Sequence, residues 1–219
     1  GGASIAPSFI YHEGYEKGQE KLVEYIEMAT RLGFAAHAVI GFTMGLTDVM
    51  VEDKAIKQDI RDMYELYSQK VIEAENLWGS KQYLSLATTE DEKVFAASDP
   101  VGFIDEKIHK YTSEYEDRLL VPIENAQGAG NPMQIAVRSK ARGKDMNVRQ
   151  MCGSYGQTLV GGKRLRVGIN HDRSLAHFPM KGDNGETYDL KHPAHSGFIY
   201  SSYSDGFEPT EYWFGSTGG

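Results

Sequence analysis

The sequence predicts an α+β protein that is mostly helical, and three observations support this fold class. Apolar residues recur at three- and four-residue steps in residues 52–78 and again in residues 101–120, which predicts two long amphipathic helices. Residues 153–207 are rich in Gly, Ser, His and Asp, which predicts loops and short strands. We therefore expect a long antiparallel helical hairpin followed by a loop-rich basic segment.

Length and composition restrict the class of protein. The chain has 219 residues, enough for one or two domains, with 40% hydrophobic and 25% charged residues. No apolar run approaches the roughly 20 residues that cross a membrane. We expect neither a membrane protein nor a disordered one.

The N-terminus and the cysteine content indicate where the protein works. The chain starts GGASIAPSF, without an initiator Met and without the features of a signal peptide, which suggests a cut or trimmed chain that is not secreted. Its one cysteine, Cys152, excludes an internal disulfide and fits a reducing compartment. We expect a protein that is not exported from the cell.

The first fifty residues predict one short helix and one extended segment. Residues 17–32 carry apolar side chains at helical spacing, and Gly33 is suited to a helix C-cap. Residues 37–49 (HAVIGFTMGLTDV) are rich in branched residues and glycine, which favours an extended segment or strand.

The predicted hairpin is acidic. Between Asp48 and Glu124 there are eighteen acidic residues against nine basic ones, and the two helices are joined by a polar stretch, residues 79–98. A projecting acidic arm is typical of a docking or spacer element. The pattern fits an ordinary core hairpin equally well.

Two further helix starts follow Pro122. Residues 131–152 have helical composition, with Pro132 suited to the first turn and Gly143 interrupting the pattern. Near the end of the chain, Pro209 can occupy the first helical position of another helix.

A basic segment stands out from the net charge of −8. Residues 131–175 hold nine Lys or Arg against two acids, a net +7, so the rest of the chain carries −15. Local potential decides where anions concentrate, so this segment is suited to binding phosphate. A solvated basic face is the alternative.

Two further patterns in the sequence could indicate a binding site. Lys163 follows glycines as in a P-loop, but Gln157 and Arg164 occupy places that need Gly and Ser or Thr, so we reject that motif. Four histidines and Cys152 leave zinc binding open as an alternative; the histidines are His171, His177, His192 and His195. No Asp-x-Asp-x-Asp cluster is present to hold catalytic metals, and we expect no metal in this chain.

The second half of the chain resembles the largest subunit of multisubunit DNA-dependent RNA polymerases, the bacterial beta-prime subunit and its archaeal and eukaryotic counterparts. The resemblance rests on NPMQIAVRSKARGKDMNVRQMCGSYGQTLVGGKRLRVG, HDRSLAHF and HSGFIYSSYSDGFEPTEYWFGSTGG, in order over residues 131–219. Residues 31–49 are similar to an earlier family segment. The resemblance implies an internal fragment or a split subunit, with a viral or phage source suspected. It implies a cytoplasmic or nucleoid-associated location, or the host cell cytoplasm or virion if the source is viral.

The resemblance implies roles for five residues of the basic segment. Arg142 matches the basic residue that approaches the phosphates of the incoming nucleoside triphosphate, and a guanidinium suits that role. Arg149 and Gln150 match positions on the wall of the same cavity. Lys140 and Lys144 replace the usual Gly and Ser, adding positive charge there.

The resemblance also implies that the last helix opens the bridge helix of the polymerase. Pro209 and Glu211 match its start, and Tyr212, Trp213 and Phe214 match its aromatic opening. For most of these three aromatic residues we expect plain core packing. The helix is expected to continue in another polypeptide or in a removed part of the same one.

Four segments follow from the resemblance: a funnel entry helix and extended segment (1–49), a secondary-channel rim hairpin (50–122), a funnel and nucleotide-entry wall (123–207) and the start of the bridge helix (208–219). The implied function is nucleotidyl transfer by an assembly, not by this chain alone. Implied partners are other polymerase subunits or split-subunit fragments, DNA template, RNA and nucleoside triphosphates. Mg²⁺ is expected on another chain.

Two alternatives stay open from the residues alone. One is a non-catalytic binding module, with an acidic helical docking arm and a basic region that contacts nucleic-acid backbone. The other is a small histidine-dependent metalloenzyme.

Overall fold

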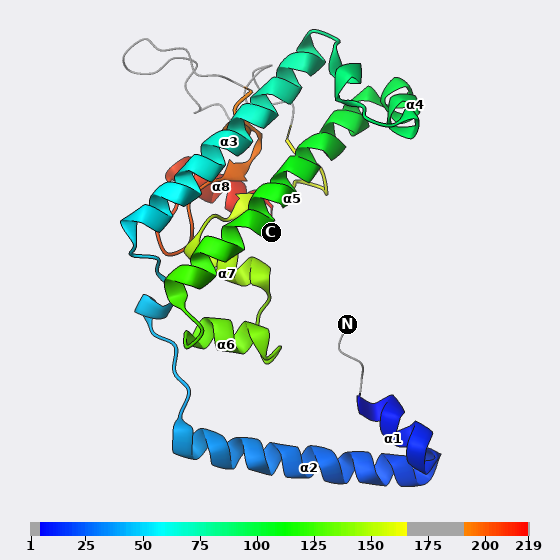
Figure 1. Ribbon diagram of the computed structural model, residues 1–219, viewed down its shortest axis with the longest axis vertical. Helices are drawn as coiled ribbons and strands as arrows, with labels where there is room; N and C mark the ends of the chain where they lie inside the picture. The colour runs from blue at the N-terminus through cyan, green and yellow to red at the C-terminus, as the bar shows by residue number, and fades with distance from the viewer. Residues whose placement is uncertain (1–4, 166–190, 219) are drawn as a thin grey trace. The chain divides into compact units, whose positions relative to one another are not determined.

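The computed structural model describes residues 5–165 and 191–218, and the chain divides into two compact units, residues 1–44 and 45–219 (Figure 1). Helices dominate both units, and one two-stranded sheet lies in the second, which confirms the mostly helical α+β class. Among the helices of the described residues, none combines the length and apolarity needed to cross a membrane.

The first unit consists of two helices, and it corrects the expected helix end at Gly33. The helices are α1 (Ile5–Glu13) and α2 (Tyr15–Ile40). Helix α2 runs through Gly33 and ends at Gly41, which has a φ of 72° and donates its N–H to the His37 carbonyl at 2.9 Å. Glycine ends a helix where it adopts the left-handed region, and Gly33 does not.

The expected extended segment, residues 37–49, is also wrong in its first part. Residues 37–40 are the last turn of α2, because the alanines before them are strong helix formers. Residues 41–45 carry no strand, and the 3₁₀ helix η1 (Leu46–Val49) follows in the second unit.

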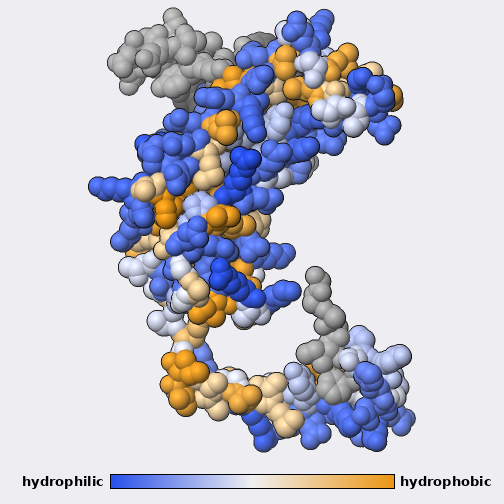
Figure 2. All heavy atoms as spheres, in the orientation of Figure 1, coloured by the Kyte–Doolittle hydropathy of each residue, from blue (hydrophilic) through white to orange (hydrophobic). Residues whose placement is uncertain are grey.

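Helix α2 leaves much apolar surface uncovered within its own unit. Figure 2 shows hydrophobic residues gathered at the end of α2. Val39 and Ile40 there are more than four-fifths exposed, and Phe42 and Met44 are about half exposed. A helix gains most of its stability by packing an apolar face, and much of the apolar face of α2 is exposed within this unit.

The second unit is built on two long helices, α3 (Lys54–Gly79) and α5 (Pro100–Gln127). They run antiparallel side by side (Figure 1), with Tyr67 Oη 3.1 Å from Thr112 Oγ1 across the contact. Helix α5 continues past Pro122, where the sequence suggested a change. The buried residues Leu119 and Ile123 flank that proline, and their packing offsets the lost hydrogen bond.

Aromatic rings join the long helices to the small sheet. The strands β1 (Gly156–Gln157) and β2 (Phe198–Ile199) pair antiparallel. Phe198 places its ring 4.8 Å from that of Tyr67 and 5.7 Å from that of Tyr115, and the two tyrosine rings stack 5.2 Å apart. The loop-rich half is therefore packed onto the hairpin.

The polar stretch 79–98 is more ordered than its composition suggests. It contains the 3₁₀ helix η2 (Tyr83–Leu86) and the helix α4 (Glu90–Ser98). Thr89 caps α4 by accepting the Glu92 N–H at 3.2 Å. Glu92 in turn accepts a hydrogen bond of 2.7 Å from Lys107, which ties α4 to α5.

Four further helical elements follow the hairpin in the described part of the sequence. They are α6 (Pro132–Arg138), α7 (Asp145–Cys152), the 3₁₀ helix η3 (Pro193–Ser196) and α8 (Pro209–Thr217). Pro132 and Pro209 stand in first turns, and the pattern breaks between α6 and α7, as the sequence indicated.

The hairpin core should dominate the stability of the second unit. Replacing Leu119, which is fully buried, with Ala should lower the free energy of unfolding by about 2–5 kcal/mol through lost burial and a residual cavity. Val121→Ala, at a position 61% exposed on the same helix, is the control and should cost much less. Equal losses in a denaturant titration would contradict this core.

The attachment of α4 should depend on pH. Lys107 and the Thr88 N–H and hydroxyl lower the pKa of Glu92 from 4.5 to about 2. Because the folded pKa lies below the unfolded value, the contact stabilises the fold above pH 4.5 and is lost as the pH falls toward 2.

The substitution Lys107→Met should raise the Glu92 pKa toward 4.5, which a carboxyl NMR titration would measure. Lys93→Met, which removes an exposed pair with Glu90, should leave that pKa unchanged. An unshifted Glu92 pKa in Lys107→Met would refute the assigned cause.

Candidate functional site

The loop between α6 and α7, residues 139–144, has a strained backbone that its sequence is suited to hold. Gly143 has a φ of 82°, and a Cβ there would lie 3.2 Å from Val137 Cγ2. Lys140 also has a positive φ, 59°. The Arg142 N–H donates to the Ala136 carbonyl at 3.2 Å, so the loop folds back onto α6.

This loop presents a group of cations to solvent. Lys140, Arg142 and Lys144 are all exposed. None of the three side chains forms an ion pair with any residue that the structure describes. Three unneutralised charges within five residues create a local positive potential that attracts anions.

Other arginines of the basic segment, unlike the cations of this loop, form ion pairs. Three of them pair with glutamates of the two long helices: Arg138 with Glu124 at 3.3 Å, Arg149 with Glu116 at 2.6 Å, and Arg164 with Glu75 at 2.6 Å. The basic segment therefore divides into arginines that attach it to the hairpin and cations that stay exposed. Two of its arginines, Arg166 and Arg173, lie outside the described residues.

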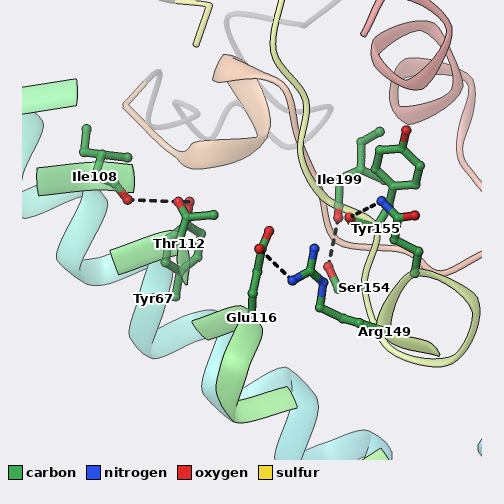
Figure 3. A network of polar contacts seen from close by, with 9 residues as sticks. Tyr67, Ile108, Thr112, Glu116, Arg149, Ser154, Tyr155 and Ile199 are labelled. Carbon is green, nitrogen blue, oxygen red and sulfur yellow. Dashed lines mark hydrogen bonds and ion pairs between the residues drawn. The ribbon is translucent and has the colours of Figure 1, made fainter. Parts of the chain in front are cut away.

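Arg149 and Gln150 lie at the contact between α7 and its neighbours. Figure 3 shows the Arg149 side chain directed at Glu116, which projects from α5. Burial raises the pKa of Glu116, and Arg149 and the Gln157 backbone amide counteract that rise. Gln150 donates to the Tyr155 carbonyl at 3.4 Å, so both side chains have partners within the chain.

Helix α8 places its aromatic residues on different sides, which corrects one expectation. Phe214 is buried, whereas Tyr212 is 62% and Trp213 57% exposed. We expected most of the three to pack in the core, but only Phe214 does, so the expectation is wrong for Tyr212 and Trp213. Consecutive helical positions point about 100° apart, so a helix that buries one neighbour exposes the others.

Glu211 anchors the start of α8. Its Oε1 accepts hydrogen bonds from the Tyr200 and Ser201 amides, both at 3.1 Å, and its Oε2 accepts the Glu208 N–H at 3.1 Å. The residue thus acts in a capping box and also ties the helix to the segment after β2.

The zinc alternative gains nothing from the part of the chain that is described. There, no three His, Cys, Asp or Glu side chains gather as metal ligands would. Cys152 accepts a hydrogen bond from Gln127 at 3.0 Å, and burial raises the pKa of its thiol to about 11. His171 and His177 lie outside the described residues.

Comparison with known families identifies the class of protein. Residues 88–199, which run from α4 through the basic loop to β2, match the profile of the family "RNA polymerase Rpb1, domain 4". The match covers just over half of the chain, so the chain belongs to this family. The resemblance to the largest subunit of multisubunit RNA polymerases is thereby confirmed.

Individual relatives of the chain are also subunits of RNA polymerases. The chain is 29% identical over 204 residues to a DNA-directed RNA polymerase subunit Rpo1N from Thermoplasma acidophilum, with 92% of this chain and 21% of the relative covered. It is 30% identical over 206 residues to the subunit Rpo1N of Methanocaldococcus jannaschii, covering 93% of this chain and 14% of the relative. The chain thus spans about a fifth or less of these relatives. They do not test a viral or phage source.

Sequence reasoning missed the acidic partners of the site. Glu116 and Glu124 were counted only among the eighteen acids between Asp48 and Glu124, but they pair with arginines of the basic segment. Their spacing of eight places them on one broad side of α5, which could have suggested a shared role. Which arginine pairs with each glutamate depends on how the segment after α5 folds back onto that helix.

The loop backbone can be tested directly. Gly143→Ala should destabilise the protein by about 1–2 kcal/mol, because an L-residue is strained at positive φ and the new Cβ meets Val137. Gly130→Ala is the control, since Gly130 has open space and no positive φ. Indistinguishable unfolding midpoints for the two variants would argue against this loop conformation.

Proposed function

We propose that this chain forms the secondary-channel funnel and the nucleotide-entry side of the active centre in a DNA-directed RNA polymerase. The assembly would synthesise RNA from nucleoside triphosphates on a DNA template, and this chain would not act alone. Its partners would be the other polymerase subunits, the template and the RNA.

One observation carries this proposal: the exposed, unpaired cations of residues 139–144 lie inside the segment that matches the polymerase family. A triphosphate carries several negative charges, and a guanidinium such as Arg142 can donate to two phosphate oxygens at once. Arg138 and Arg149, on either side of the loop, are neutralised by glutamates, whereas the three cations of the loop are not.

The proposed contribution of the chain is electrostatic. Phosphoryl and nucleotidyl transfer depend on positioning and on stabilising charge on the phosphates. Arg142 would neutralise charge as it develops on the leaving pyrophosphate, with Lys140 and Lys144 raising the local potential. We place the catalytic Mg²⁺ on another chain, because this sequence has no Asp-x-Asp-x-Asp cluster.

We assign the other elements by the same proposal. The α3–α5 hairpin, with α4 at its tip, would form the rim of the secondary channel, and α8 would open the bridge helix. The exposed Tyr212 and Trp213 would then face other parts of the polymerase. The apolar surface of α2 would be covered by the remainder of the largest subunit.

The binding-module alternative is less well supported. A non-catalytic module with an acidic docking arm would also have an acidic hairpin and a basic loop. Membership in an RNA polymerase family favours the polymerase proposal over that alternative.

Substitution of Arg142 in the assembled enzyme tests the proposal. Arg142→Ala should remove a charge-assisted contact worth about 1.5–3 kcal/mol, which lowers kcat/KM for nucleotide addition roughly ten- to over a hundredfold. Arg142→Lys should restore part of the rate, because it keeps the charge but not the planar pair of donors.

Arg61→Ala is the matched control, since Arg61 is an exposed arginine on α3 without an ion pair to a described residue. It should leave nucleotide addition unchanged. Normal elongation by Arg142→Ala at limiting nucleotide would disprove the assignment.

A further inference from the structure

Both helices that flank the basic loop are attached to the same helix by arginine–glutamate pairs. Arg138, the last residue of α6, pairs with Glu124, and Arg149, in α7, pairs with Glu116. The two glutamates lie on α5, eight residues apart. The helices on both sides of the loop that carries Arg142 are therefore anchored to α5 by one ion pair each.

The two attachments differ in strength. In the Arg138–Glu124 pair the side chains are 50% and 38% exposed at 3.3 Å, and exposed pairs contribute little. In the Arg149–Glu116 pair they are 12% and 20% exposed at 2.6 Å. Removing one member of a shielded pair leaves the other charge uncompensated, so this pair matters more.

Glu116 also contacts the strand that follows α7. A Cβ at Gly156 would lie 2.5 Å from Glu116 Oε1, so only glycine lets β1 approach the carboxylate this closely. Gly156 has a φ of 95°, which glycine adopts readily. One carboxylate thus lies where α5, α7 and β1 meet, as Figure 3 shows for its contact with Arg149.

We propose that Glu116 is a positioning residue: by holding Arg149 it fixes α7, and thereby fixes the 139–144 loop that presents Arg142 to the nucleotide. The role in nucleotide addition rests on the proposed function. The role in fixing the loop does not. Arg149, in this assignment, acts through Glu116 and not by contact with substrate.

The test uses the assembled polymerase containing Glu116→Gln, which keeps the shape of the side chain and removes its charge. Two quantities are measured: deuterium uptake of the peptide spanning residues 139–144, and kcat/KM for addition of a single nucleotide. Uptake should rise, and kcat/KM should fall about tenfold, because small displacements of a positioning group reduce rates strongly.

Three comparisons with matched variants isolate the effect. Glu114→Gln changes a carboxylate on the same helix that is 44% exposed and pairs with Lys70 at 3.7 Å, and it should alter neither quantity. Glu124→Gln removes the weaker attachment and should alter uptake less than Glu116→Gln does. Arg149→Lys keeps the positive charge, so its effect should be smaller than that of Arg149→Gln.

A double variant separates positioning from a general loss of structure. In an Arg142→Ala background, Glu116→Gln should lower kcat/KM less than twofold further, because residues that act through one another are not additive. A full, additive loss in that background would overturn the proposal that Glu116 acts through the loop. Unchanged uptake in Glu116→Gln would overturn its role in fixing the loop.

The same measurements distinguish failure of the proposed function from failure of the proposed role of Glu116. If Arg142→Ala alone left kcat/KM unchanged, the nucleotide-entry role of Arg142 would be wrong, while uptake would still decide whether Glu116 fixes the loop. If Glu116→Gln did not assemble, Arg149→Gln, which removes the other charge of the pair, would supply the same two measurements, and unchanged uptake there would count against the proposal.

Discussion

The packing of α3 against α5 is the interaction on which the rest of the second unit depends. The two helices bury a continuous apolar stripe, and the rings of Tyr67, Tyr115 and Phe198 extend that core into the small sheet. A two-residue strand pair has little stability of its own. Its position, and with it the position of the loop-rich half, is therefore set by the aromatic contacts with the hairpin.

Charge is divided between two tasks in the basic segment. Arginines that return to the hairpin meet glutamates there, and pairing makes their burial tolerable. The cations of the 139–144 loop are exposed and form no ion pair with a described residue, so they keep their charge available. An acidic chain can in this way present a local anion-binding surface, because neutralisation is specific to each position.

The fold was predictable where apolar residues recur with a strong helical period. It was less predictable where a single residue decides the end of a helix or which of its sides is buried. The stripes of α3 and α5 marked both helices, and Pro132 and Pro209 marked two helix starts. Gly33 was misjudged because a helix end depends on the φ that the glycine adopts. The exposure of Tyr212 was misjudged because composition does not say which side of a helix is covered.

The sequence by itself determined the class of protein, the long helices and the position of the basic loop, since these depend on residue order and spacing along the chain. Tertiary structure alone decided which cations are neutralised. Glu116 and Arg149 are 33 residues apart in sequence, and their contact exists only because α7 folds back onto α5. Ion pairs of this kind depend on distances of a few ångströms in space, which no local pattern encodes.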